Sequence, residues 1–102
     1  MKLALIQTTC HDENEAKKIA NVLIEELLAA CIQITPIESF YKWQGEFCND
    51  KEILLNIKTK KKNFKKIESK IKELHSYDVP EIICIEIKKS YKEYKEFINK
   101  NC

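Results

Sequence analysis

The feature that most constrains this chain is a pair of long extended segments on either side of Gly45, its only glycine. Residues 31–43 and 52–59 both alternate as strands do; in the second, Ile53, Leu55 and Ile57 share one face, and the opposite face holds Glu52, Leu54, Asn56 and Lys58. A glycine between two such segments favours a tight turn. We therefore predict one β-hairpin over residues 31–59, with Pro36 marking an edge strand or a bulge.

The predicted hairpin is too long for a small monomer. Each arm has about 14 residues, whereas strands usually have 5–6. An unsupported two-stranded ribbon is marginally stable, and this one carries exposed aromatic residues at Phe40, Tyr41, Trp43 and Phe47. A neighbouring copy of the chain would cover them, so the hairpin favours an oligomer.

The remaining periodicities alternate between strand and helix. Residues 2–9 and 81–87 indicate strands, the second opening after Pro80. Asp12 and Glu15 form a capping-box pattern that starts a helix of about four turns ending near residues 29–31. Residues 64–74 predict a second amphipathic helix.

A last helix is predicted from a second capping-box pattern, Ser90 with Glu93. It is expected to bury Tyr91, Tyr94, Phe97 and Ile98. The whole order predicts one α/β domain (an α+β sandwich) over residues 1–102: a ferredoxin-like βαββαβ unit plus a C-terminal helix. Right-handed crossovers would place both main helices on one face of the sheet.

Composition limits the binding partners that the protein can have and the cell compartment in which it works. The 18 basic residues, all lysine, nearly balance 16 acidic ones, which gives no excess charge for a nucleic acid. No apolar run reaches the roughly 20 residues of a membrane span, and the N-terminal one is shorter than the ~7–15 of a signal peptide. Five cysteines, an odd number without a C-x-x-C pair, indicate reduced thiols, so we predict a cytoplasmic protein.

Three functions common in this fold lack their required residues. The predicted third strand, EILLNIKT, has no glycine- and aromatic-rich RNA-binding signature. The segment after the first strand, QTTCHDENE, has one cysteine where a copper chaperone has two. No arginine is present to hold a phosphoryl group. No nucleophile, base and orienting group stand together either, so an enzyme is not predicted.

For the other reactive side chains we predict structural roles. The lysine cluster at residues 58–66 is expected to be a solvated helix face rather than a nucleic-acid patch. Cys10 and His11 are expected in a surface loop, with no acid placed to orient the histidine. Cys31 and Cys84 are expected to be small buried apolar residues.

The segment His75-Ser76-Tyr77-Asp78-Val79-Pro80-Glu81 is the strongest site candidate in the sequence. A histidine, a phenol and two carboxylates lie together between a helix and a strand, where loops gather and a cleft can open. The same groups could instead cap the helix and stiffen the turn before Pro80. The residues alone leave both interpretations open.

Four ordered blocks then resemble the CutA divalent-cation-tolerance family. They are residues 28–31 (LAAC), 39–45 (SFYKWQG), 52–59 (EILLNIKT) and 75–82 (HSYDVPEI), and the likeness runs from Leu3 to Ile98. The resemblance implies a ferredoxin-like fold related to the PII signalling proteins. It also implies a cyclic homotrimer in which long hairpins pack on neighbouring subunits, and a role in tolerance of copper and other divalent metals without catalysis.

The resemblance also implies which residues matter. The family's cleft positions correspond to Tyr41, Trp43, Glu52, Lys58, His75, Tyr77, Pro80 and Glu81. A copper site proposed for bacterial members uses a cysteine and two histidines, at positions occupied here by Gln7, Leu74 and His75. Only His75 is retained as a metal-ligand candidate, and Ser76 replaces a usual proline.

Our leading hypothesis is a trimeric, cytoplasmic protein of metal-ion tolerance that binds a divalent cation such as copper weakly, without a required cofactor. Two rivals remain. One is a PII-like sensor that takes a small molecule or a protein partner in a cleft between subunits. The other is a trimeric scaffold whose polar cleft residues serve only the interface.

Overall fold

The architecture is a four-stranded antiparallel sheet with two helices on one face, seen in a computed structural model that describes residues 1–102. The elements are β1 (Leu3–Cys10), α1 (Glu13–Glu25), β2 (Cys31–Trp43), β3 (Glu46–Lys60), α2 (Phe64–Leu74), β4 (Ile82–Ile87) and α3 (Lys92–Asn101), with a 3-10 turn at Lys61–Asn63. The strand order is β2-β3-β1-β4. The predicted βαββαβ order with a C-terminal helix is confirmed.

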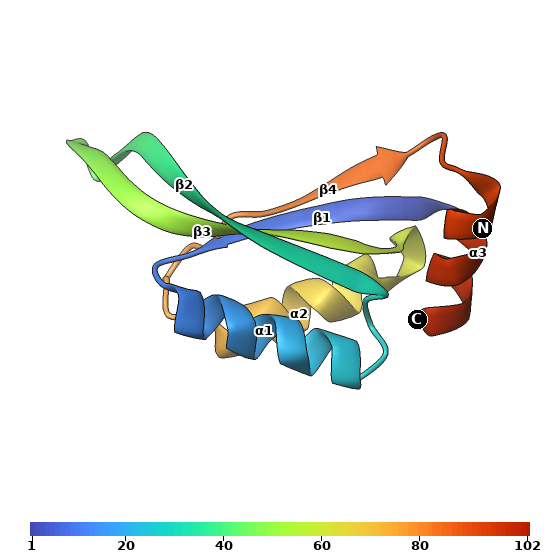
Figure 1. The fold of residues 1–102 in the computed structure, drawn as a ribbon. Helices are drawn as coiled ribbons and strands as arrows, with labels where there is room; N and C mark the ends of the chain where they lie inside the picture. The colour runs from blue at the N-terminus through green and yellow to red at the C-terminus, as the bar shows by residue number, and fades with distance from the viewer.

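The core lies between the sheet and the two helices, α1 and α2, that cover it (Figure 1). Alternate residues of β1 and β3 point inward in register, with Ile6 opposite Ile57. Ile19 of α1 and Ile71 of α2 meet them, and all four side chains are fully buried. Burying each such side chain stabilises the fold by about 1.5–3 kcal/mol, so this one layer supports the sheet and both helices.

The opposite face of the sheet has no helix across its centre (Figure 1). Gln7 and Asn56 pair there through a 2.8 Å Nε2–H···Oδ1 hydrogen bond. Beside them, Ile83 and Ile85 of β4 are 44% and 46% exposed. We call this surface the open face; its isoleucines are apolar area that the single chain does not bury.

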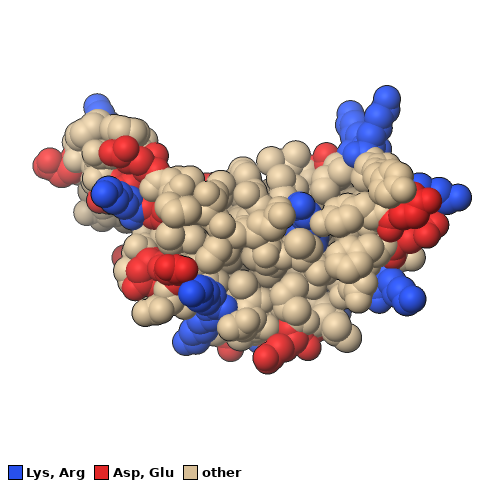
Figure 2. Space-filling view, viewed as in Figure 1, with Lys and Arg blue, Asp and Glu red and all other residues tan.

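The hairpin projects beyond the body of the protein (Figures 1 and 2). β1 pairs with β3 only from Ile53 onward, so residues 37–43 and 46–52 pair only with each other. We call this segment the hairpin arm. It lengthens the molecule to 44 × 25 × 22 Å. The overlong hairpin is thus confirmed, and it lacks support within the chain.

The tip of the arm is a two-residue turn. Gln44 and Gly45 both have positive φ, at 50° and 83°. Two consecutive left-handed residues define a type I′ turn, whose twist matches that of the two strands. The turn at the only glycine is therefore where the sequence predicts it.

Pro36 lies on an edge strand without a bulge. β2 pairs with β3 alone, and its register runs unbroken from Cys31 to Trp43, with Pro36 opposite Ile53. Of the two interpretations of this proline, the edge strand is correct. Because the ladder is continuous, the proline nitrogen, which carries no hydrogen, faces the unpaired edge.

Helix α1 is shorter than predicted, ending at Glu25 instead of near residue 30. Leu27 adopts a left-handed conformation with φ 57°, its N–H bonds to the Ile24 carbonyl, and the N–H of Leu28 bonds to the Leu23 carbonyl. This pair of bonds is a Schellman motif built without glycine. The apolar pattern continues past Glu25 because Leu28 and Ala29 still pack on the core.

Three further predictions of local structure are wrong. Helix α3 begins at Lys92 with Tyr91 as its N-cap and has no side-chain cap, so Ser90 and Glu93 form no capping box. Of the four residues that the last helix was expected to bury, only Ile98 is buried, and Tyr91 is 74% exposed, because no element of this chain covers that face. Cys84 is exposed and Cys31 half-buried, since they lie on the two outer strands.

No helix in the structure combines the length and the apolar composition needed to cross a bilayer.

Candidate functional site

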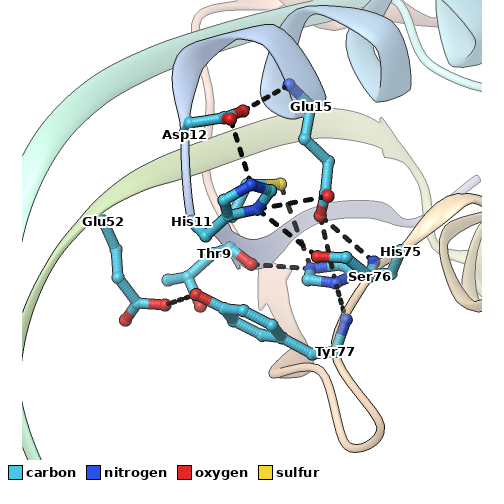
Figure 3. Close-up of polar contacts among 9 residues, drawn as sticks. Thr9, His11, Asp12, Glu15, Glu52, His75, Ser76 and Tyr77 are labelled. Atoms are coloured by element: carbon cyan, nitrogen blue, oxygen red, sulfur yellow. Dashed lines mark hydrogen bonds and ion pairs between the residues drawn. The ribbon is translucent and has the colours of Figure 1, made fainter.

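The candidate site forms where β1 ends, α1 begins and α2 ends (Figure 3). Asp12 caps α1, its Oδ1 accepting the N–H of Glu15 at 2.9 Å, which confirms the first half of the predicted capping box. The Glu15 side chain has different partners, because it points towards the end of α2. This arrangement brings residues 9–15 beside residues 75–77.

His75 is held by backbone groups at both ring nitrogens, and its side chain is fully buried. Nε2 lies 2.7 Å from the carbonyl oxygen of Thr9. A carbonyl can only accept, so Nε2 carries the proton and donates it to Thr9. Nδ1 then accepts the backbone N–H of Tyr77 at 3.1 Å. The ring is thereby fixed in one tautomer and one orientation.

Glu15 stands between the two histidines of the chain (Figure 3). Its Oε1 is 3.2 Å from Nδ1 of His75 and its Oε2 is 3.3 Å from Nδ1 of His11. Oε1 also accepts the backbone N–H of Ser76 at 3.3 Å. Nε2 of His11 lies 3.0 Å from Oδ2 of Asp12. One carboxylate thus links the start of α1 with the loop that follows α2.

Cys10 completes a group of three metal-ligand types. Its side chain is fully buried, and its Sγ lies 3.9 Å from Nε2 of His75. Burial, with the Glu15 carboxylate next in effect, raises the pKa of the Cys10 thiol from 9.0 to about 12. The ligand atoms of Cys10, Glu15 and His75 lie within 4.8 Å of one another. Thiolate, carboxylate and imidazole are ligands suited to zinc or copper.

The prediction of a surface loop without an orienting acid is correct for the position of His11, which lies in an exposed bend between β1 and α1. It is wrong for Cys10 and for the acid. Cys10 is the last residue of β1 and is buried, and Glu15 contacts both histidines. The spacing of His11 and Glu15, four positions apart at a helix start, was the available signal, since such residues share a helix face. Nothing local indicated that Cys10 would meet a residue 65 positions away.

A cleft of about 640 Å³ opens beside this cluster, between the hairpin arm and the loop after α2. Its walls come from the arm, from the end of β1 and from the loop at residues 76–81. The lining residues are Thr9, Ser39, Phe40, Tyr41, Trp43, Glu52, Ser76, Tyr77, Asp78, Val79 and Glu81.

Five of the eight predicted cleft positions line this one space: Tyr41, Trp43, Glu52, Tyr77 and Glu81. Pro80 is not among the lining residues, and the structure places Lys58 apart from them. It pairs with Leu5 in the sheet, and its Nζ lies 5.4 Å from the centre of the Tyr94 ring on α3. His75 lies behind the cleft wall, next to Thr9 and Tyr77.

Two phenols in the cleft donate to carboxylates. Tyr77 Oη donates to Oε2 of Glu52 at 2.6 Å, and Tyr41 Oη donates to Oδ2 of Asp50. Burial, followed by the bond to Glu52, raises the pKa of Tyr77. The hydrogen bond to Asp50 is the main cause that raises the pKa of Tyr41 to about 12. Both phenols therefore stay protonated near neutral pH and anchor the arm and the loop to acidic partners.

The two positions that depart from the family's proposed copper site do not join the cluster. Gln7 is bonded to Asn56 on the open face. Leu74 is partly buried against the core. Of those three positions, only His75 belongs to the group of metal-ligand side chains that also contains Cys10 and Glu15.

The fold and the site together define a ferredoxin-like protein with a buried thiol–carboxylate–imidazole cluster beside an aromatic, acidic cleft. The sequence profile of the CutA1 divalent ion tolerance proteins matches residues 4–101. The chain belongs to the CutA1 divalent ion tolerance family.

Individual relatives agree with this assignment. The divalent-cation tolerance protein CutA of Thermus thermophilus is 41% identical over 98 residues, 95% of each chain. A solved structure from Archaeoglobus fulgidus, described as a periplasmic divalent cation tolerance protein CutA, is 34% identical, covers 97% of both chains and has a TM-score of 0.95. The chloroplastic CutA of Arabidopsis thaliana is 37% identical over 92% of this chain, which spans 52% of that longer protein.

Proposed function

We propose that this protein acts in divalent metal-ion tolerance by weak, direct binding of a cation such as copper or zinc at His75, with Cys10 and Glu15 as co-ligands. The protein works as a cytoplasmic homotrimer of a single domain, needs no resident cofactor and catalyses no reaction. Family membership and the tolerance names of its relatives support the general role.

The observation that carries the proposal is the convergence of three ligand types from distant parts of the chain. Cys10, Glu15 and His75 bring their ligand atoms within 4.8 Å, and no other such group of three exists in the protein. Structural zinc sites use ligands of these types, usually four of them. Three ligands leave one coordination position for water or for a further donor.

Two features of the cluster make the binding weak. Both nitrogens of His75 already have hydrogen-bond partners, so a cation must displace either Tyr77 N–H or the bond to Thr9. The raised pKa of the Cys10 thiol means that binding must also expel a proton held tightly at pH 7. We expect a dissociation constant on the order of micromolar or poorer.

The trimer is supported by surfaces that one chain leaves uncovered. The hairpin arm pairs only with itself, and Phe40 and Phe47 on it are 66% and 70% exposed. The open face adds Ile83 and Ile85. A closed ring of three copies would bury this apolar area and leave no free end for further growth. The cytoplasmic location is supported by five unpaired cysteines, which persist in a reducing compartment.

The test is calorimetric titration of Zn²⁺, which a thiol does not reduce, into wild type, Glu15→Gln, His75→Ala and Cys10→Ser at pH 7.5. We expect micromolar or weaker binding in wild type, loss in His75→Ala and at least tenfold weakening in the other two variants. Wild-type affinity should fall again at pH 5.5, because protons compete for the imidazole and the thiol.

The control is Cys31→Ser, which removes a half-buried thiol outside the cluster and should bind as wild type does. Circular dichroism of each variant separates loss of a ligand from loss of the fold. Nanomolar affinity, or binding that is unchanged in both His75→Ala and Cys10→Ser, would contradict the proposal.

A further inference from the structure

The contact between Glu15 and His75 is not a hydrogen bond. His75 gives its Nε2 proton to the Thr9 carbonyl, and its Nδ1 already accepts the N–H of Tyr77. Oε1 of Glu15 nevertheless lies 3.2 Å from that same Nδ1. Both atoms are acceptors, and two acceptors at this distance repel each other unless a cation lies between them. The pair is therefore arranged for a positive ion that the chain itself does not supply.

Glu15 has no cationic lysine among its partners. Its side chain is only 12% exposed, and it contacts the two imidazoles and the backbone N–H of Ser76. Carboxylates buried to this extent are normally paired with a positive group or coordinate a metal. The second oxygen, Oε2, points to the other histidine of the chain, His11 (Figure 3).

His11 has the arrangement of a metal-binding histidine. Its Nε2 lies 3.0 Å from Oδ2 of Asp12, and its Nδ1 lies 3.3 Å from Oε2 of Glu15. A ligating imidazole usually donates its other ring N–H to a carboxylate or a backbone carbonyl, which fixes the tautomer and aims the free nitrogen at the metal. Asp12 provides this acceptor for His11, as Thr9 does for His75. Both rings thus direct Nδ1 towards the same carboxylate.

The distances around Glu15 resemble those between ligands of one ion. Zinc binds nitrogen and oxygen at about 2.0–2.2 Å, so two ligands of a tetrahedral site lie about 3.3–3.5 Å apart. The two contacts of Glu15 with the imidazoles, 3.2 and 3.3 Å, are close to this value. His11 itself lies outside the group of ligand atoms within 4.8 Å, so it must turn inward to join it. Its side chain is 51% exposed, so this movement disturbs no core packing.

We propose that His11 is the fourth ligand of the cation site, through Nδ1, and that Asp12 orients its ring. This inference rests on the proposed function and completes the donor set as two imidazoles, one thiolate and one carboxylate. Four such ligands suit tetrahedral Zn²⁺, whereas Ca²⁺ and Mg²⁺ require oxygen ligands. These residues belong neither to the hairpin arm nor to the open face, so the site does not need those surfaces to be free.

The test compares wild type with His11→Ala by calorimetric titration of Zn²⁺ at pH 7.5. We expect the variant to bind at least tenfold more weakly, because water replaces one imidazole. Co²⁺ provides a second readout, since its visible absorption depends on the ligand atoms that surround it. The spectrum of bound Co²⁺ should differ between the two proteins, which loss of a merely structural contact would not produce.

Three further variants separate ligation from charge and from local structure. Ser76→Ala removes a hydroxyl 3.3 Å from Nδ1 of His11 and should bind Zn²⁺ as wild type does. Asp12→Asn keeps the cap of α1, because asparagine caps as well as aspartate, but should weaken binding about tenfold. Glu13→Gln removes an equal charge from an exposed position, where Glu13 pairs with Lys17, and should have no effect.

The inference alone is overturned if binding is lost in His75→Ala while His11→Ala matches wild type in affinity and in its Co²⁺ spectrum. Equal weakening in Asp12→Asn and Glu13→Gln would overturn the orienting role of Asp12 and indicate general charge attraction. Absence of Zn²⁺ binding in wild type, or binding unchanged in both His75→Ala and Cys10→Ser, would instead overturn the proposed function and this inference with it.

Discussion

His75 donates a 2.7 Å hydrogen bond from Nε2 to the backbone carbonyl of Thr9, a residue 66 positions earlier in the chain. The bond joins the end of α2 to the end of β1 inside the protein. The Tyr77 N–H occupies the other ring nitrogen at 3.1 Å, so the imidazole also fixes the start of the loop that walls the cleft. One side chain therefore contributes both to the fold and to the candidate metal site.

Replacing His75 by alanine should lower the free energy of unfolding by about 2–3 kcal/mol, because two buried backbone groups lose their partner. Urea unfolding at a fixed protein concentration measures the change. His11→Ala, at a half-exposed position, should cost less than about 0.5 kcal/mol. Equal losses in the two variants would show that the bonds of His75 are unimportant.

Cys10 should resist alkylation in the folded protein. Its pKa of about 12 leaves almost no thiolate at pH 8, and its side chain is fully buried. Peptide mapping after iodoacetamide treatment should show labelling at least about 100-fold slower in the native protein than in 8 M urea. Comparable rates in the two conditions would contradict the buried position.

The same thiol gives stability a defined pH dependence. In the unfolded chain it ionises near pH 9.0, but in the native state it keeps its proton to about pH 12. The native state therefore binds more protons between these values, so Cys10 stabilises fully below pH 9 and progressively less above it. Between pH 8 and 11, the melting temperature should fall less steeply with pH in Cys10→Ala than in wild type. An identical pH dependence in the two proteins would rule out this contribution.

Light scattering at low micromolar concentration should give a mass three times that of the 12.0 kDa chain. The hairpin arm and the open face are the reason, because a monomer would leave both in water. A mass of a single chain would exclude the trimer and with it our account of the long hairpin.

Trp43 should be packed at or near the interface between subunits, although it is 45% exposed within one chain. Tryptophan is favoured in interface cores, so Trp43→Ala should weaken assembly or lower the melting temperature of the trimer. Wild-type emission should be blue-shifted and shielded from iodide. Red-shifted, fully quenched emission with unchanged melting in the variant would place the residue in solvent.

Much of this fold could be predicted because its signals are local. Alternation fixed the faces of residues 52–59, the Asp12 cap fixed the start of α1, and the single glycine fixed the hairpin turn. Helix ends were harder to predict. Leu27 ends α1 in a left-handed conformation, which is usually marked by a glycine. Helix α3 was mispredicted because an apolar stripe indicates a buried face without saying whether the same chain covers it.

The candidate site was only partly predictable. Residues of the 75–81 segment could be singled out because several polar groups lie together in sequence. The cluster of Cys10, Glu15 and His75 could not, since its members meet only after β1 and α2 have packed at the same end of the sheet. Glu15 was interpreted as part of a cap, whereas its carboxylate in fact reaches two histidines.

Pro36 has a consequence for the behaviour of this protein at high concentration. β2 is a thirteen-residue strand with one unpaired edge, and such an edge is a template on which further chains can add as in a fibril. The proline nitrogen offers no hydrogen to an incoming strand, so a continuous ladder along the whole edge cannot form. Short pairing beyond Pro36, along the hairpin arm, remains open to a neighbouring subunit. A single residue thus permits finite association while opposing amyloid-like growth.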